Sequence, residues 1–100
     1  MAFCLHRNLQ GGDPPYLLVI QHPFLDDALV SRIVVPVVLS SQRNPIPRLN
    51  PPLTVEDRAC VAMVPNLVAV PKRYLGAEVP YAGLDDDDIK RCLDRLFFGI

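Results

Sequence analysis

The stretch "LDDDDIKRCLDRLFF" (residues 84–98) changes the periodicity of the sequence and predicts one helix at its end. Asp85 is a candidate N-cap residue, and Asp88 stands three residues later in the position of a capping-box acid. Leu84 and Ile89 occupy the two positions of a hydrophobic staple around this cap. These signals fix where the helix is expected to begin.

The apolar side chains of this helix gather into one stripe at about 100° per residue, so we expect the stripe to dock on a sheet. It comprises Ile89, Cys92, Leu93, Leu96 and Phe97. Phe98 falls opposite Ile89, which predicts that Phe97 lies in the core and Phe98 points away from it. With Gly99 and Ile100, Phe98 forms a compact apolar knob of the kind that anchors protein interfaces.

The four consecutive aspartates at 85–88 are interpreted as a solvated, dipole-compatible helix start. Favourable ion pairs are predicted between Asp86 and Lys90 and between Asp87 and Arg91. Consecutive carboxylates on a helix point in different directions, so we expect neither a metal site nor a cofactor here.

The residues before this helix predict short strands separated by turns, because eleven prolines argue against an all-helical fold. The expected strands are Phe3–Arg7, Tyr16–Gln21, Arg32–Leu39, Leu53–Val55, Arg58–Val64 and Asn66–Pro71. Glu56 and Asp57 would form the turn of a hairpin. Pro36 has no N–H to donate, so an edge or a bulge is expected there. The fold class is therefore mainly β with one C-terminal α-helix.

Two segments are expected to be surface loops, residues 8–15 with two glycines and two prolines, and the proline-rich residues 40–52. The second carries four prolines, and we expect it to be among the most mobile parts of the chain.

Composition bounds the class of protein. A chain of 100 residues with 50% apolar content predicts one domain over residues 1–100. The net charge is −1 with scattered basic residues, which argues against non-specific binding of DNA or RNA. Direct sequence-specific contact with nucleic acid is not expected either. Three widely spaced cysteines indicate reduced thiols. Neither a signal peptide nor a membrane span is expected, which favours a cytoplasmic protein.

Three stretches, in this order and spacing, resemble the CcdB toxins of bacterial toxin–antitoxin modules. They are "SRIVVPV" (31–37), "VAMVPNLVAVPKRYLGAEV" (61–79) and the ending "LFFGI" (96–100). The resemblance extends over roughly residues 16–100. It implies an SH3-like β-barrel of the CcdB/MazF type with a C-terminal helix.

The same resemblance implies function. CcdB toxins form two-fold homodimers, bind the A subunit of DNA gyrase and trap the enzyme on cleaved DNA. A small, partly disordered antitoxin, CcdA, neutralises them. Phe98, Gly99 and Ile100 match the poisoning tail, and Asp94 matches a helix position that is typically asparagine. The best-known tail has tryptophan where this chain has Phe98.

The resemblance also bears on assembly. Phe24 and Leu25 align with an apolar pair near the two-fold interface of the family, although such a pair is equally compatible with intrachain core. In this interpretation the protein is not an enzyme and inhibits a topoisomerase by protein–protein contact.

Two alternative functions remain open from the sequence. MazF/PemK-type endoribonucleases use the same barrel and need an acid, a base and a cation close together. The candidates for these roles are His6, His22, Arg32, Asp26 and Asp27. The near-neutral charge gives RNA little to hold. The second alternative is a non-toxic relative that only binds an antitoxin.

Overall fold

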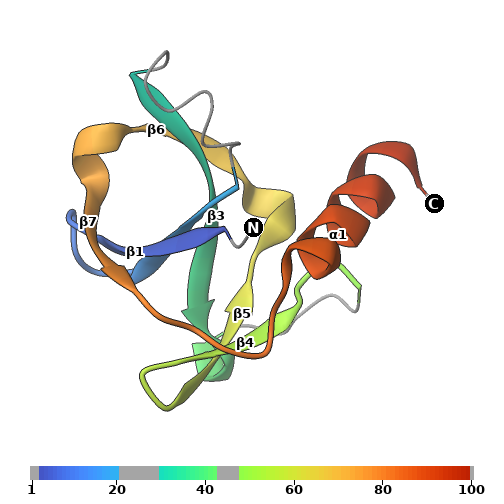
Figure 1. Cartoon of the computed structure of the whole chain (residues 1–100), viewed down its shortest axis with the longest axis horizontal. Coiled ribbons are helices and arrows are strands. Elements are labelled where there is room, and N and C mark those ends of the chain that lie inside the picture. The colour runs from blue at the N-terminus through green and yellow to red at the C-terminus, as the bar shows by residue number, and fades with distance from the viewer. Residues whose placement is uncertain (1–2, 21–29, 43–47, 100) are drawn as a thin grey trace.

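The computed structural model describes residues 3–20, 30–42 and 48–99, and it consists of seven strands, three short 3₁₀ turns and one α-helix in these ranges (Figure 1). The strands are β1 (Cys4–Asn8), β2 (Tyr16–Val19), β3 (Ser31–Leu39), β4 (Pro52–Val55), β5 (Arg58–Ala62), β6 (Val68–Pro71) and β7 (Leu75–Val79). The 3₁₀ turns are η2 (Ser40–Gln42), η3 (Val64–Asn66) and η4 (Lys72–Tyr74), and the helix is α1 (Asp86–Phe98).

The strands form one antiparallel sheet in the order β4-β5-β3-β2-β1-β7, with β6 paired to β3 beside this path. Beyond β7, Ala82 pairs with Thr54 on β4 through two backbone hydrogen bonds of 2.8 and 3.0 Å. This bridge joins the two ends of the sheet order, and the strands curl into a ring in Figure 1. The small barrel followed by one helix confirms the predicted fold class.

The long strand β3 is the centre of the barrel because it pairs with three others. β2 lies along one side, while β6 and then β5 share the other side. Pro36 stands where β3 changes partner between β6 and β5, and its carbonyl accepts a hydrogen bond from the Met63 N–H at 2.8 Å. A missing N–H is tolerated at such an interruption. β3 is a central strand and not an edge strand, but its ladder is interrupted beside Pro36, between the residues paired with β6 and those paired with β5.

The hairpin β4–β5 turns at Glu56 and Asp57, as predicted, and both residues have positive φ values of 52° and 64°. Positive φ at both central positions is the geometry of the tight two-residue turn that matches strand twist. Glu56 also accepts hydrogen bonds from the buried Tyr16 hydroxyl and from Arg7 Nη2, the latter at 2.7 Å. Arg58 donates to the Tyr16 hydroxyl at 2.9 Å. The hairpin is thereby tied to β1 and β2.

We expect this hairpin network to make stability depend on acid pH. Hydrogen bonds from Arg7 and then Tyr16 hold the pKa of Glu56 below its usual value. A carboxylate with a lowered folded pKa stabilises the fold above its unfolded pKa of about 4.3 and loses that contribution as the pH falls through the folded value. Urea unfolding at neutral pH and near pH 3 should show a smaller acid-induced loss for Glu56→Gln than for the wild type.

The control for this measurement is Glu78→Gln, which removes an exposed carboxylate on β7. Its acid profile should match that of the wild type. A Glu56→Gln profile that matches the wild type as well would show that the network does not contribute to acid stability.

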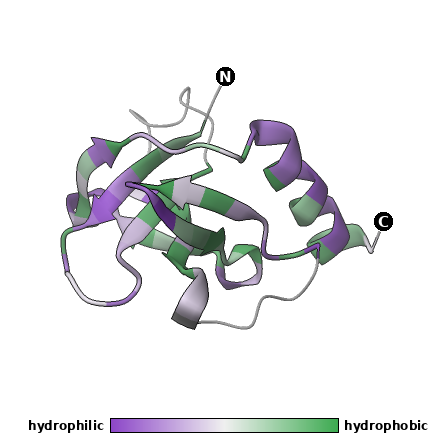
Figure 2. Cartoon of the chain, turned by 90° about the horizontal axis from the view of Figure 1, so that it is seen from below, coloured by the Kyte–Doolittle hydropathy of each residue, from purple (hydrophilic) through white to green (hydrophobic). Residues whose placement is uncertain are grey.

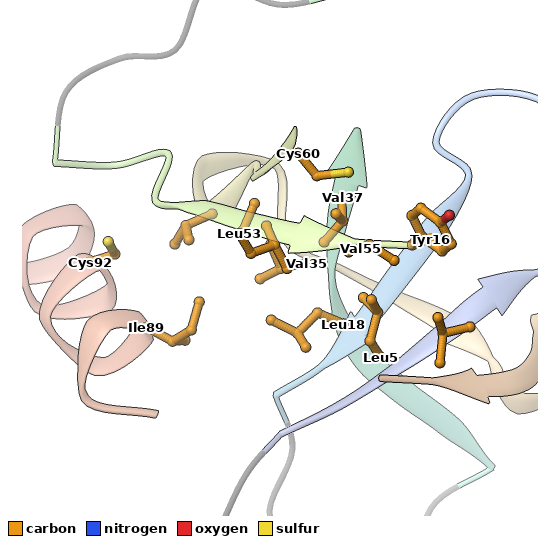
Figure 3. Packing of buried hydrophobic residues seen from close by; sticks show 13 residues of the cluster. Leu5, Tyr16, Leu18, Val35, Val37, Leu53, Val55, Cys60, Ile89 and Cys92 are labelled. Carbon is orange, nitrogen blue, oxygen red and sulfur yellow. The ribbon is translucent and has the colours of Figure 1, made fainter. Parts of the chain in front are cut away.

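The core fills the barrel and continues under the helix. Alternate residues of β2 and β3 belong to the main core cluster, and the residues between them (Leu17, Val19 and Val34) form a second, smaller cluster. Figure 2 shows that the strands are largely apolar, whereas α1 carries both apolar and hydrophilic positions. The fully buried residues of the main cluster are Leu5, Tyr16, Leu18, Val35, Val37, Leu53, Val55, Cys60, Ala62, Val64, Val79, Ile89 and Cys92. Ile89 and Cys92 point from α1 toward the barrel residues Leu53 and Val35 (Figure 3). The helix is therefore part of the core.

The start of α1 is fixed both by its cap and by the barrel. Asp85 accepts from the Asp88 N–H at 2.9 Å, and the Asp88 side chain accepts from the Asp85 N–H at 3.0 Å, which confirms the predicted capping box. Asp86 accepts from the Phe3 N–H at 3.0 Å, which ties the helix to the chain before β1. Arg91 pairs with Asp88 at 2.8 Å, one helical turn away, whereas Asp87 was the predicted partner.

The other differences from the predicted strands lie at their ends. Residues 75–79 form β7 and pair with β1, although the sequence predicted no strand there. Val64 and Asn66, assigned to strands from the sequence, belong to η3. Asn50 is buried, so the segment 40–52 does not lie wholly on the surface.

Candidate functional site

The last turn of α1 extends past the barrel (Figure 1), and its two adjacent aromatic side chains are both exposed. Phe98 is 74% exposed, as predicted, but Phe97 is 62% exposed, so its predicted place in the core is wrong. The buried side of the helix is centred between Ile89 and Cys92, and Phe97 lies about 110° away from that centre at 100° per residue. It stands at the margin of the stripe, in the last turn of the helix, which extends beyond the sheet.

We therefore expect Phe97→Ala to change the free energy of unfolding by less than about 1 kcal/mol, as is usual for an exposed position. Emptying a core position would instead cost roughly 3–5 kcal/mol. Urea unfolding of the variant and the wild type separates the two cases. A loss in the larger range would show that Phe97 is packed in the folded protein in solution.

Phe97 and Phe98 share their exposed face with Asp94, which lies three and four residues before them and is itself exposed. The helix ends at Phe98 and is capped by Gly99, whose φ of 72° is left-handed and whose N–H donates to the Arg95 carbonyl at 3.1 Å. Glycine adopts this conformation without the strain that a side chain would add. We call Asp94, Phe97, Phe98 and Gly99 the tail surface. Ile100 lies outside the described residues.

A pocket of about 410 Å³ lies beside the tail surface, between α1 and residues 48–52. We call it the arginine pocket, and it is lined by Arg48, Asn50, Pro51, Pro52, Asp88, Arg91, Cys92 and Arg95. The Arg48 carbonyl accepts hydrogen bonds from Cys92 Sγ and from Arg95 Nη1, each at 3.1 Å. These two bonds join the segment after residue 47 to the helix.

Two titratable groups of the arginine pocket have shifted pKa values. Burial raises the pKa of the Cys92 thiol, so it stays protonated and donates to the Arg48 carbonyl. The Asp85 N–H and then Arg91 lower the pKa of Asp88, which keeps that carboxylate charged. The pocket therefore contains three cations and one anion among the described residues.

The residues proposed from the sequence for ribonuclease chemistry are not brought together by the described structure. His6 on β1 and Arg32 on β3 are separated by β2 in the sheet. His6 Nδ1 contacts the Gly76 carbonyl at 2.9 Å, and Arg32 is buried with Nη1 donating to the Ser31 carbonyl at 3.1 Å. Three other candidates (His22, Asp26, Asp27) lie outside the described residues, as do the proposed interface residues Phe24 and Leu25.

Sequence reasoning missed the exposure of Phe97 and the whole arginine pocket. Helical periodicity gave no signal for the first, because Cys92 at the opposite margin of the same stripe is buried. The pocket had no local signal, because Arg48 and Arg95 are 47 residues apart and meet only when the helix docks. Within the described residues, no group of three or more His, Cys, Asp or Glu side chains is placed to hold a metal ion.

Comparison with known proteins agrees with the fold. No helix in the described ranges is long and apolar enough to cross a membrane. No curated protein is similar enough in sequence to count as a match. The sequence profile of the CcdB protein family matches residues 2–99, which is nearly the whole chain. The chain belongs to the CcdB family.

Proposed function

We propose that residues 1–100 act as one toxin domain that binds the A subunit of DNA gyrase and traps the gyrase–DNA cleavage complex through Phe98, Gly99 and Ile100. Membership of the CcdB family suggests a toxin of a toxin–antitoxin module. The observation that carries the finer proposal is the tail surface, where two aromatic rings are exposed on the free end of a capped helix.

The geometry of the tail surface suits a contact with a cation on the partner. A phenylalanine ring offers a π-face to an arginine, although it is smaller than tryptophan and lacks its N–H donor. The difference from a tryptophan tail is on the order of 0.5–1 kcal/mol at a desolvated site. The exposed Asp94 stands one turn before the rings and supplies a carboxylate to the same contact. The exposed Phe97 extends the apolar area beyond the residues expected from the sequence.

The proposal includes a two-fold homodimer with Phe24 and Leu25 at or near its interface. Two tails related by a two-fold axis would meet equivalent sites on the gyrase A dimer, which has the same symmetry. The partner that neutralises the toxin is a CcdA-like antitoxin whose site overlaps or opposes the tail surface. Because gyrase acts on chromosomal DNA, the proposed site of action is the cytoplasm.

This function requires no catalytic residues, and the protein acts by contact with gyrase. Expression of the chain should arrest the growth of a gyrase-sensitive host and spare an otherwise identical host with a resistant gyrase A subunit. Equal arrest of both hosts, together with cleavage of RNA by the purified protein, would favour the ribonuclease alternative. Absence of arrest in both would favour a non-toxic relative.

A further inference from the structure

The arginine pocket has an excess of positive charge that its own residues do not neutralise. Arg48, Arg91 and Arg95 line it, and Asp88 is its single carboxylate among the described residues. The Asp88 carboxylate already pairs with Arg91 at 2.8 Å and accepts a hydrogen bond from the Asp85 N–H at 3.0 Å. Guanidinium groups bind carboxylates through paired, charge-assisted hydrogen bonds. The pocket therefore complements an anionic ligand.

One wall of the pocket, at Arg48, is tied to α1. Arg48 adopts a positive φ of 73°, which is unusual for a residue with a side chain. The two hydrogen bonds from Cys92 and Arg95 to the Arg48 carbonyl hold it there. A strained backbone position that its surroundings maintain is typical of a binding site. Ligand binding at a preformed pocket requires less ordering than binding at a flexible one.

The arginine pocket is continuous with the tail surface along α1. At about 100° per residue, Arg91, Arg95 and Phe98 fall within a sector of about 60°. Arg95 precedes Phe98 by three residues, which places the two side chains next to each other on the helix. A chain that leaves the pocket toward the end of α1 reaches Phe98 within one turn.

We infer that the arginine pocket binds an acidic segment of a partner polypeptide and that the apolar residues of the same segment cover Phe98. This inference rests on the proposed function when it identifies the partner as the antitoxin. A pocket of about 410 Å³ accommodates one or two acidic side chains rather than a folded domain. Extended segments that alternate charged and apolar residues match this arrangement of a cationic pocket followed by exposed rings.

The test uses the full chain and a short fluorescein-labelled peptide of repeating Glu-Leu-Ser, with a Gln-Leu-Ser peptide as its uncharged match. Fluorescence anisotropy should detect binding of the acidic peptide and much weaker binding of the uncharged one. The double variant Arg48→Gln with Arg91→Gln should weaken binding of the acidic peptide at least about tenfold. The single variant Arg91→Lys keeps Arg48 and retains the charge at position 91, so it should bind the acidic peptide more tightly than the double variant does.

The matched control is Arg73→Gln on η4, across the barrel from α1 in Figure 1, and it should bind the acidic peptide as the wild type does. Equal weakening by Arg73→Gln, or equal binding of the two peptides, would overturn the inference. So would a double variant with wild-type affinity. In ¹⁵N-labelled protein, the acidic peptide should shift the Gly99 amide resonance, and an unshifted resonance would refute the contact with the tail.

Gyrase inhibition by the same variants is measured separately. A wild-type chain that binds the acidic peptide at the pocket but fails to inhibit gyrase would remove the proposed function and leave the pocket as a binding site. A chain that inhibits gyrase but does not bind the peptide would support the proposed function and overturn the inference about the pocket.

Discussion

Phe98→Ala abolishes gyrase poisoning in this account, while changing the free energy of unfolding by less than about 1 kcal/mol. The ring is 74% exposed, so its removal takes away little packing within the chain. It is also the proposed anchor in the partner, and anchors of this kind account for most of the binding energy at an interface. The measurement is accumulation of cleaved DNA in a gyrase assay, paired with urea unfolding of the same preparation.

Two further variants separate the ring from general apolarity. Phe98→Trp keeps an aromatic face and should retain poisoning. Leu9→Ala removes another exposed apolar side chain, 65% exposed in the segment after β1, and should leave poisoning unchanged. If Phe98→Ala unfolded the protein, the tail would be structural. If it folded and still poisoned gyrase, the tail would not be the binding element.

Ile89→Ala should have the largest effect on stability, roughly 2–5 kcal/mol, because it empties a fully buried position between helix and barrel. Ile89 is 1% exposed and packs in the main core cluster with residues of the barrel strands. Marginal stability in a chain of this size makes such a loss a large part of the total. Urea unfolding followed by circular dichroism measures it.

The matched control is Lys90→Ala, which changes the adjacent but exposed residue of the same helix and should stay within about 0.5 kcal/mol of the wild type. Poisoning by Ile89→Ala should fall in proportion to its folded fraction, since the tail surface itself is unchanged. An Ile89→Ala variant as stable as the wild type would mean that α1 is not docked on the barrel in solution.

Local sequence signals predicted the elements with local causes. The capping box of Asp85 and Asp88 and the turn at Glu56 and Asp57 were both found, because each depends on residues within four positions of one another. The strand β7 was missed because it is held by its pairing with β1, about seventy residues earlier. The ladder gap at Pro36 likewise depends on β6 and β5, which the residues around Pro36 do not specify.

The candidate site was predicted in part for the same reason. Helical periodicity alone placed Phe98 on the outside, and the structure confirms that exposure. Helical periodicity misplaced Phe97 because it gives the direction of a side chain around the helix axis and does not tell where the barrel ends along that axis. The arginine pocket depends on the contact of Arg48 with Cys92 and Arg95, a tertiary contact with no counterpart in the local pattern.

The proposed mechanism is tested most directly by incubating the purified wild-type chain with DNA gyrase, supercoiled plasmid and ATP, and then trapping covalent complexes with detergent and protease. If the tail surface poisons gyrase, linear DNA accumulates with increasing amounts of the chain and does not accumulate with Phe98→Ala. If a folded wild-type chain produced no linear DNA at concentrations well above that of gyrase, the claim that this protein poisons gyrase through its C-terminal tail would be contradicted.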